Sequence, residues 1–509
     1  MQKIVTTTLC AMPLLAAAAG GDKRPNVILL VADDLGYGDL SCYGAKRVST
    51  PNVDRLAAQG VRFTDAHATA STSTPSRYSL LTGEYAWRRE GTDIAAGNAG
   101  MIIRPERFTL ADMFKSEGYT TAAIGKWHLG LGDKTAQQDW NAPLPMALGD
   151  IGFDYSYIMA ATADRVPCVF IENGRVANYD PSAPIQVSYK ENFPGEPTGK
   201  DNPELLYNLK FSPSQGHNQS IVNGISRIGY SKGGGKALWK DENIADSIAA
   251  KAIDFIKDNR EKPFFMYLCT NDVHVPRFPH ERFRGKSPMG LRGEAIMQFD
   301  WTVGQVVDAL KKLKLTENTI IIITSDNGPV LDDGYVDKAV ELVGDHQPSG
   351  PFRGGKYSTY EAGTTVPFIV CWPGNTPKGK VSDALVSHID DFASFASLIG
   401  ARLPKGAAPD SRNAMNTWLG KSDESRPFVV EQSVDHTLSI HDGEWKYIEP
   451  SNGAKRAWGT GIETGYMRKP QLYNLKTDKA EQTDLAEKNS EQVYRLQEAL
   501  RQIRLGRAK

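Results

Sequence analysis

The sequence has almost no net charge, because 59 lysines and arginines stand against 60 aspartates and glutamates in 509 residues. A nucleic-acid-binding protein normally carries a basic excess that neutralises phosphates, so the balance argues against nucleic acid as a partner. The same balance gives no reason to expect recruitment to an anionic membrane surface. A negatively charged substrate would have to be held by a local cluster of cations, since the field of the whole protein would not attract it.

Cysteine and long hydrophobic runs are also scarce. The chain has five cysteines and neither a CxxC pair nor a histidine-rich zinc pattern. Export would permit two disulfides among Cys42, Cys168, Cys269 and Cys371, but the last two lie in apolar, strand-like runs and are expected to be buried thiols. Beyond the N-terminus no stretch has the roughly 20 apolar residues that a membrane-spanning helix needs, so we expect no membrane insertion.

Residues 1–21 have the pattern of a secretory signal peptide. Lys3 supplies a positive charge, residues 4–19 are mostly apolar and end in small side chains, and a polar sequence begins at Gly20. A membrane anchor is the alternative, but the run is short and is interrupted by threonines at 6–8. Leu9 precedes Cys10, where a lipoprotein cleavage site requires a small residue. We therefore expect export to the periplasm or the extracellular space.

Four apolar, β-branched runs are each followed directly by polar or charged residues. Helical segments at 243–257 and 294–313 lie among them, and the composition is that of a globular protein. Continuous apolar strands separated by helices predict an α/β fold whose mostly parallel sheet is covered on both faces. The runs and the residues that follow them are 27–31 with Asp33 and Asp34, 120–124 with Lys126 and His128, 264–268 with Asn271, Asp272 and His274, and 319–323 with Asp326 and Asn327.

The last hundred residues have a different pattern. Residues 445–448 and 471–475 alternate like antiparallel strands, and residues 490–505 are amphipathic. We therefore predict an α/β catalytic domain over residues 22–405 and a smaller subdomain, an antiparallel sheet with a helix, over residues 406–509. Ligand sites of parallel sheets lie beyond the carboxyl ends of the strands, so the four strand ends predict one site built from distant parts of the chain.

The segment Ser73-Thr74-Pro75-Ser76-Arg77, followed by Leu81-Thr82-Gly83, resembles the signature of the type I sulfatases, in the alkaline phosphatase superfamily. The resemblance implies an alkaline-phosphatase-like fold and oxidation of Ser73 to Cα-formylglycine, whose hydrate is the nucleophile. A serine at this position implies an anaerobic, radical-type formylglycine-generating maturase as a partner. An engineered replacement of cysteine by serine, made to trap substrate, would give the same residue at position 73. The sequence leaves open whether the serine is natural or engineered.

Asp33, Asp34, Asp326 and Asn327 offer oxygen ligands from two strand ends that we expect to be neighbours. Carboxylate and amide oxygens suit Ca²⁺ or Mg²⁺ better than zinc. Such a cation would hold an anionic sulfate ester and a negatively charged nucleophile together despite their repulsion. The resemblance implies one Ca²⁺ per chain, with residue 73 as a further ligand. A helix cap at Asp34 is the alternative for that residue alone.

A cationic group is predicted around the sulfate. Residues 125–130 resemble the second signature of the family, and the glycines at 354–355 resemble its late lysine loop. The resemblance implies that Lys126 and Lys356 bind sulfate oxygens, and that Arg77 orders the formylglycine and the cation. His128 would act as a base on the hydrate, while His274 would protonate or stabilise the departing alcohol. A lysine can serve as this acid as well.

Substrate choice is expected in the segments least like the family. Residues 131–240 are rich in turns and include Asp164-Arg165 and His217-Asn218, while residues 345–353 precede the predicted catalytic lysine. Carboxylate, histidine and arginine side chains can form paired hydrogen bonds to sugar hydroxyls. The predicted sugar contacts are Arg165, Asp345, His346 and Arg353.

The sequence therefore predicts an exported, exo-acting carbohydrate sulfatase. Its substrate would be a sulfated glycan with galactose, N-acetylgalactosamine or a related sugar, from host glycans or algal polysaccharides. One alternative is a phosphonate or phosphate-ester hydrolase of the same superfamily. Another is a sulfated-glycan binding protein without turnover, because an unmodified serine can accept a sulfuryl group but lacks the second hydroxyl needed to release it.

Overall fold

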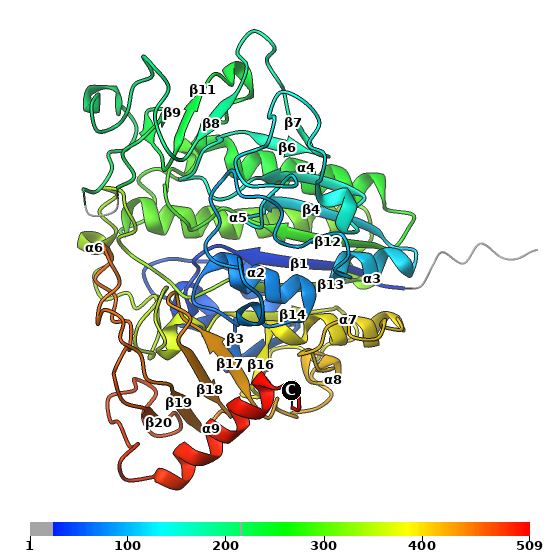
Figure 1. Ribbon diagram of the computed structural model, residues 1–509. Coiled ribbons are helices and arrows are strands. Elements are labelled where there is room, and N and C mark those ends of the chain that lie inside the picture. The colour runs from blue at the N-terminus through cyan, green and yellow to red at the C-terminus, as the bar shows by residue number, and fades with distance from the viewer. Residues whose placement is uncertain (1–23, 214–215, 509) are drawn as a thin grey trace, which may run out of the picture.

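The computed structural model describes residues 24–213 and 216–508. The predicted signal peptide lies outside the described residues. A ten-stranded sheet runs through the molecule in the order β15-β2-β14-β13-β1-β12-β4-β5-β6-β7, with helices on both faces (Figure 1). The fold is therefore the predicted α/β class, with a large, mostly parallel sheet.

The centre of the sheet is parallel. Strand β1 (Asn26–Ala32) pairs in parallel with β13 (Thr319–Ser325) on one side and with β12 (Phe264–Cys269) on the other, and β12 pairs with β4 (Thr120–Lys126). All four predicted apolar runs are strands, and the two that precede the predicted metal ligands are neighbours. Their polar ends therefore meet at one edge of the sheet.

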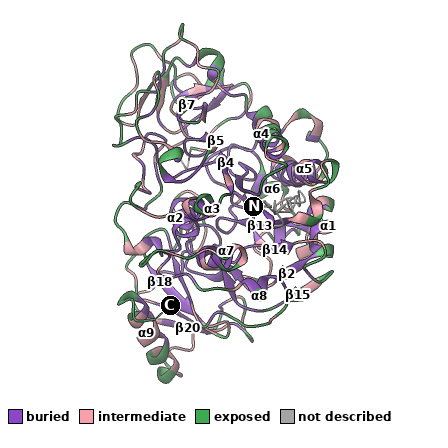
Figure 2. Cartoon of the chain, turned by 90° about the vertical axis from the view of Figure 1, so that its right-hand side faces the viewer, coloured by how far each residue is buried: buried purple, intermediate pink, exposed green. Residues whose placement is uncertain are grey.

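Helices cover each face because side chains alternate along each strand. In β1, Val27, Leu29 and Val31 contribute to the core on the face that α3 (Leu110–Ser116) and α7 (Asp391–Ile399) cover. Ile28 and Leu30 contribute to the opposite core, formed with α4 (Ile244–Asp258) and α5 (Gly290–Lys312). Each fully buried aliphatic or aromatic side chain stabilises the fold by about 1.5–3 kcal/mol. In Figure 2 the buried residues lie along the strands.

The remaining elements flank this centre. The outer strands of the large sheet are β5 (Tyr155–Met159), β6 (Phe170–Glu172), β7 (Arg175–Val176), β14 (Phe368–Cys371), β2 (Val61–Phe63) and β15 (Lys380–Ser382). Two-stranded ladders are formed by β8 (Gln186–Ser188) with β11 (Tyr230–Lys232), β9 (Ile221–Val222) with β10 (Ile225–Ser226), and β3 (Ala66–His67) with β16 (Val386–Ser387). Further α-helices are α1 (Pro51–Gln59), α2 (Ser73–Thr82), α6 (Ala339–Leu342) and α8 (Met415–Trp418).

A four-stranded antiparallel sheet forms near the C-terminus. It consists of β17 (Val429–Gln432), β18 (Leu438–His441), β19 (Trp445–Ile448) and β20 (Gln471–Asn474), and α9 (Ser490–Arg504) packs on it through Leu496, Leu500 and Ile503. The small antiparallel sheet and its helix match the predicted pattern. The boundary at residue 405 stays a prediction.

The four cysteines within the described ranges are free thiols, and Cys269 and Cys371 are buried in their strands as predicted. Within residues 24–213 and 216–508, no helix is long and apolar enough to cross a membrane.

Candidate active site

Helix α2 carries the sulfatase-like motif at its first turn. Ser73 and Arg77 are one turn apart and share a face of the helix, all of which is buried. The Ser73 hydroxyl donates to Oδ2 of Asp326 over 2.6 Å, and the Arg77 guanidinium donates to the same oxygen from Nε (3.0 Å) and Nη2 (2.8 Å). The helix thus presents both side chains to the carboxyl end of β13.

An acidic group lies across the ends of β1 and β13. Asp33 and Asp34 follow β1, Asp326 and Asn327 follow β13, and the side-chain amide of Asn327 donates to Oδ1 of Asp34 over 2.8 Å. All four are fully buried. Asp34 has φ of 57°, a left-handed conformation that is uncommon outside glycine and clusters at functional sites. Among the described residues, Oδ2 of Asp33 has no hydrogen-bond partner.

The buried carboxylates differ in their preference for the charged form. Burial raises the pKa of Asp33 well above its ordinary value, against the opposing charge of Lys126. Burial favours the neutral form of Asp326 too, but the positive charges of Arg77 and Lys126 outweigh it and lower the pKa of Asp326. Asp326 is therefore the ionised anchor of the group.

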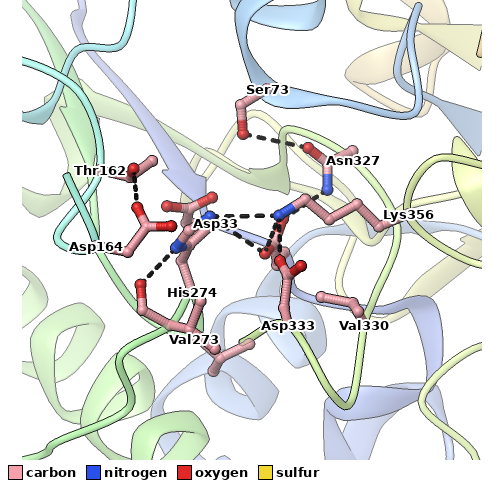
Figure 3. Close-up of polar contacts among 12 residues, drawn as sticks. Asp33, Ser73, Thr162, Asp164, Val273, His274, Asn327, Val330, Asp333 and Lys356 are labelled. Carbon is pink, nitrogen blue, oxygen red and sulfur yellow. Dashed lines mark hydrogen bonds and ion pairs between the residues drawn. The ribbon is translucent and has the colours of Figure 1, made fainter. Parts of the chain in front are cut away.

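Two lysines face these carboxylates. Nζ of Lys126 lies 2.6 Å from Oδ1 of Asp33 and donates to the Ser73 hydroxyl over 2.7 Å. Nζ of Lys356 lies 2.8 Å from Oδ2 of Asp34 and 2.9 Å from Oδ2 of Asp333, and Figure 3 shows Lys356 and Asp333 pointing toward one another. Burial disfavours the ammonium, yet the carboxylates of Asp333 and Asp34 raise the pKa of Lys356 well above its ordinary value.

The hydrogen bonds of the two site histidines fix their neutral tautomers. Nε2 of His128 donates to the carbonyl oxygen of Ala95 over 2.9 Å, which leaves Nδ1 as the nitrogen with a free lone pair. Nδ1 of His274 donates to the carbonyl oxygen of Val275 over 2.6 Å, which leaves Nε2 as its acceptor. Burial, followed by the nearby lysine charges, lowers the pKa of both histidines well below the ordinary value. Both rings are therefore neutral bases at pH 7.

A cavity of about 200 Å³ opens onto Ser73, His128, His274 and Lys356. Asp164 and His217 form part of its wall and lie 3.0 Å apart, from Oδ2 to Nε2. Arg165 lines it too and donates to Oδ1 of Asp164 over 2.9 Å. The positive charge of Arg165 and the hydrogen bond from His217 outweigh burial and hold the pKa of Asp164 well below its ordinary value. The wall beside the buried cations is therefore polar and partly charged.

The structure brings together all ten predicted catalytic and metal-ligating residues at one edge of the sheet, and places Arg165 in the cavity wall. It does not bring the other three predicted sugar contacts there. His346 is buried against Oδ1 of Asp39 over 2.8 Å, Asp345 is exposed near Arg47, and Arg353 pairs with Glu463. The sugar contacts at Asp345, His346 and Arg353 stay a prediction, since in this structure these side chains pair with other residues and do not line the cavity.

The cavity residues that the sequence reasoning missed include Asp333, Tyr357 and Trp458. Tyr357 directly follows Lys356, and its left-handed φ of 78° turns the chain at this point. Its hydroxyl donates to Oδ1 of Asp333 over 3.0 Å. Asp333 lies seven positions after Asp326, and this nearness to a predicted metal ligand is a signal by which the sequence could have indicated it as a site residue. Trp458 lies between β19 and β20, and no local pattern connects it with Ser73.

Residues 25–401 match the family model described as Sulfatase. The chain belongs to the sulfatase family. It is 52% identical, over 98% of its own length and 97% of the relative, to an N-acetylgalactosamine-6-O-sulfatase of Bacteroides thetaiotaomicron. It is 31% identical to the human steryl-sulfatase, over 87% of this chain and 76% of that protein.

One solved structure is very similar to this sulfatase. It comes from work on the metabolism of multiple glycosaminoglycans by Bacteroides thetaiotaomicron, and it superposes with a TM-score of 0.93 at 53% identity. The match covers 95% of this chain and 100% of the other. The family and these relatives make the protein a sulfuric ester hydrolase with the fold of the alkaline phosphatase superfamily.

Proposed function

We propose that this sulfatase removes the 6-O-sulfate from a terminal N-acetylgalactosamine of a sulfated glycan, working from the chain end. The observation that carries the proposal is the 200 Å³ cavity, in which neutral histidines and a charged lysine lie beside Ser73. A cavity of this size suits one sulfated sugar better than a long chain. The identity to an N-acetylgalactosamine-6-O-sulfatase supports the choice of sugar and sulfate position.

Asp33, Asp34, Asp326 and Asn327 would hold one Ca²⁺, with residue 73 as a further ligand. Their donor atoms are the carboxylate and amide oxygens that Ca²⁺ prefers, and Oδ2 of Asp33 lacks any other partner among the described residues. A bound Ca²⁺ supplies positive charge that offsets the repulsion between a sulfate ester and an anionic nucleophile. The charges of Asp33 and Asp34, which Lys126 and Lys356 now balance, would then be shared with the ion.

Ser73 would be oxidised to Cα-formylglycine by the predicted maturase. The modified residue supplies a hydrated aldehyde, with one hydroxyl for attack and a second for release of sulfate. Residue 73 is suited to this role because Lys126 donates to its oxygen over 2.7 Å while Asp326 accepts from it. An ammonium beside this oxygen favours its alkoxide form, which is the better nucleophile.

The remaining side chains divide into sulfate binding and proton transfer. Lys126 and Lys356 would donate to the sulfate oxygens, and Arg77 would hold Asp326 in place. His128 has a free lone pair on Nδ1 and would remove a proton from residue 73. Lys356 would supply the proton for the departing sugar oxygen through His274, whose Nε2 accepts from the lysine over 3.3 Å.

Asp164, Arg165 and His217 would bind the sugar ring. They lie in the cavity wall, and charged or paired polar groups there can recognise the hydroxyls of one stereoisomer. Trp458, which lines the cavity and is 73% exposed, would pack against a sugar face. The proposed setting is the periplasm or the extracellular space, after removal of residues 1–21.

The test is desulfation of a panel of sulfated monosaccharides by the matured enzyme. Release of sulfate from N-acetylgalactosamine 6-sulfate, with at least tenfold lower kcat/KM for the 4-sulfate, is the expected result. Preference for a phosphate or phosphonate ester would overturn the proposal. Binding without any sulfate release, by protein shown to contain formylglycine, would favour a glycan-binding role instead.

A further inference from the structure

A second group of buried titratable side chains lies where β3 and the short helix Glu361–Gly363 pack against the C-terminal sheet. It consists of His67 in β3, Glu361 at the start of the short helix Glu361–Gly363, Glu431 in β17 and His441 in β18. One ligand atom from each lies within 4.8 Å of the others. None of the four is more than 2% exposed. The mechanism proposed above uses none of them.

The group has more negative than positive charge. Lys446 is the ammonium in contact with it, 2.7 Å from Glu361, 3.4 Å from Glu431 and 3.5 Å from Glu481. Nδ1 of His67 lies 2.9 Å from Oε1 of Glu431. Carboxylates face both ring nitrogens of His67, Glu431 at Nδ1 and Asp65 at Nε2, so this ring is an imidazolium. Three buried carboxylates, Glu361, Glu431 and Glu481, therefore face two cations, so further positive charge is required for all of them to be ionised.

Two observations favour a metal ion as that charge. His441 is completely buried, and neither ring nitrogen has a hydrogen-bond partner within the part of the chain that the structure describes. Its Nε2 lies 3.6 Å from Oε1 of Glu431, the oxygen that His67 already faces. Asp65 accepts from Nε2 of His67 over 2.8 Å. In metal sites, a carboxylate that accepts a hydrogen bond from the ring nitrogen away from the metal orients the histidine.

We propose that His67, His441, Glu431 and Glu361 form a binding site for a divalent transition-metal ion of the zinc class, separate from the calcium site. Two imidazoles with two carboxylates match the nitrogen and oxygen ligands that zinc prefers, whereas Ca²⁺ takes oxygen ligands. On binding, Nδ1 of His67 loses its proton to solvent, and the ion replaces that proton beside Glu431.

The consequence is a cross-link between the C-terminal sheet, strand β3 and the short helix Glu361–Gly363. The four ligands come from four segments, and Glu361 follows Lys356 by five positions, so the ion fixes the base of the loop that carries this lysine. Because all four ligands are buried, the ion enters during folding. The site thus joins the C-terminal sheet to the substrate cavity.

The experiment measures metal content by mass spectrometry, in full-length mature protein expressed with added zinc and dialysed in buffer containing calcium. The expected result is about one zinc per chain in the wild type. The His441→Ala variant should contain at least tenfold less zinc than the wild type, with no loss of calcium. His436→Ala is the matched control, because this histidine lies in the turn between β17 and β18 and is half exposed against Asp93, and it should keep the zinc.

A second measurement covers the case in which His441→Ala does not fold. Wild-type protein is unfolded in the presence of a chelator and is then refolded with calcium, either with or without zinc. Zinc should raise the Tm of the refolded protein, and the X-ray absorption spectrum of the bound zinc should show two imidazole ligands. The proposal fails if wild-type protein contains no zinc and refolds to the same Tm without it, or if His441→Ala keeps the metal. An ion-pair network without a metal ion would give those results.

Discussion

Nζ of Lys356 lies 3.3 Å from Nε2 of His274, while Nδ1 of His274 lies 2.6 Å from the carbonyl oxygen of Val275. A carbonyl oxygen only accepts hydrogen bonds, so Nδ1 carries the ring hydrogen and Nε2 accepts from the lysine. The pKa of Lys356 is raised and that of His274 is lowered, so the proton of this pair resides on the lysine.

His274→Ala tests the proton path. If Lys356 protonates the departing oxygen through His274, the loss of kcat should depend on the leaving group. We expect a loss of about 10²–10⁴-fold for a sugar sulfate, whose alcohol needs a proton. The loss should be less than tenfold for an aryl sulfate, whose phenolate leaves unaided. Equal losses for both substrates would show that His274 binds sulfate instead.

Ser73→Ala tests the nucleophile. Removing the hydroxyl removes the site of maturation, and we expect kcat to fall by at least about 10³-fold. The variant should still bind substrate, because Lys126, Lys356 and the other charged groups are unchanged. Ser76→Ala is the control: it lies in the same motif, and its buried hydroxyl has no hydrogen-bond partner among the described residues. It should keep activity within about threefold.

His217→Gln and His346→Gln form a matched pair that separates substrate contacts from structural ones. His217 lines the cavity, so we expect KM to rise about tenfold, as for loss of one hydrogen bond to a charged network. His346 lies outside the cavity and supports Asp39, so its replacement should lower Tm and leave KM unchanged. Steady-state kinetics and thermal unfolding of both variants check this. A raised KM in the His346 variant would support His346 as a sugar contact.

Asp39 predicts how stability depends on acid. Burial opposes ionisation, but Arg292 and His346 outweigh it and lower the pKa of Asp39 to about 2, with Arg292 2.7 and 2.8 Å away. Because the folded pKa lies below the unfolded value, this contribution to stability is present above about pH 4 and is lost as pH falls toward 2.

Asp39→Asn should therefore remove that part of the acid dependence. It should also lower the free energy of unfolding at pH 7 by about 3–5 kcal/mol, because Arg292 loses its buried partner. Urea unfolding between pH 3 and pH 7, a range set by the carboxylate pKa values, measures both effects. An unchanged slope of stability against pH would contradict the assignment.

Trp458→Ala tests the proposed stacking on the substrate. The side chain lines the cavity and is 73% exposed, so its loss should change binding more than folding. We expect KM to rise about fivefold to tenfold, as for loss of one aromatic contact, with little change in Tm. Tyr494→Ala is the control, since Tyr494 is 70% exposed on α9 and should leave KM unchanged. Equal KM values in both variants would remove Trp458 from the substrate site.

Much of the site could be predicted because its residues follow strands. Asp33, Asp326, Lys126 and His274 each come after an apolar run, and parallel strands bring their carboxyl ends to one edge. The loop before Lys356 had no such constraint. Its charges could face the cavity or pair elsewhere, and His346 pairs with Asp39, which lies more than three hundred positions earlier.

The sequence by itself determined the α/β class, the four main strands, the sulfatase family and the residues gathered around Ser73. These features depend on local hydrophobic pattern and on short motifs. Only the tertiary structure decided which loops form the cavity wall, which nitrogen of each histidine carries hydrogen, and that His67 and His441 meet two glutamates. Such contacts join segments far apart in the chain, where packing and charge pairing across the fold select the partners.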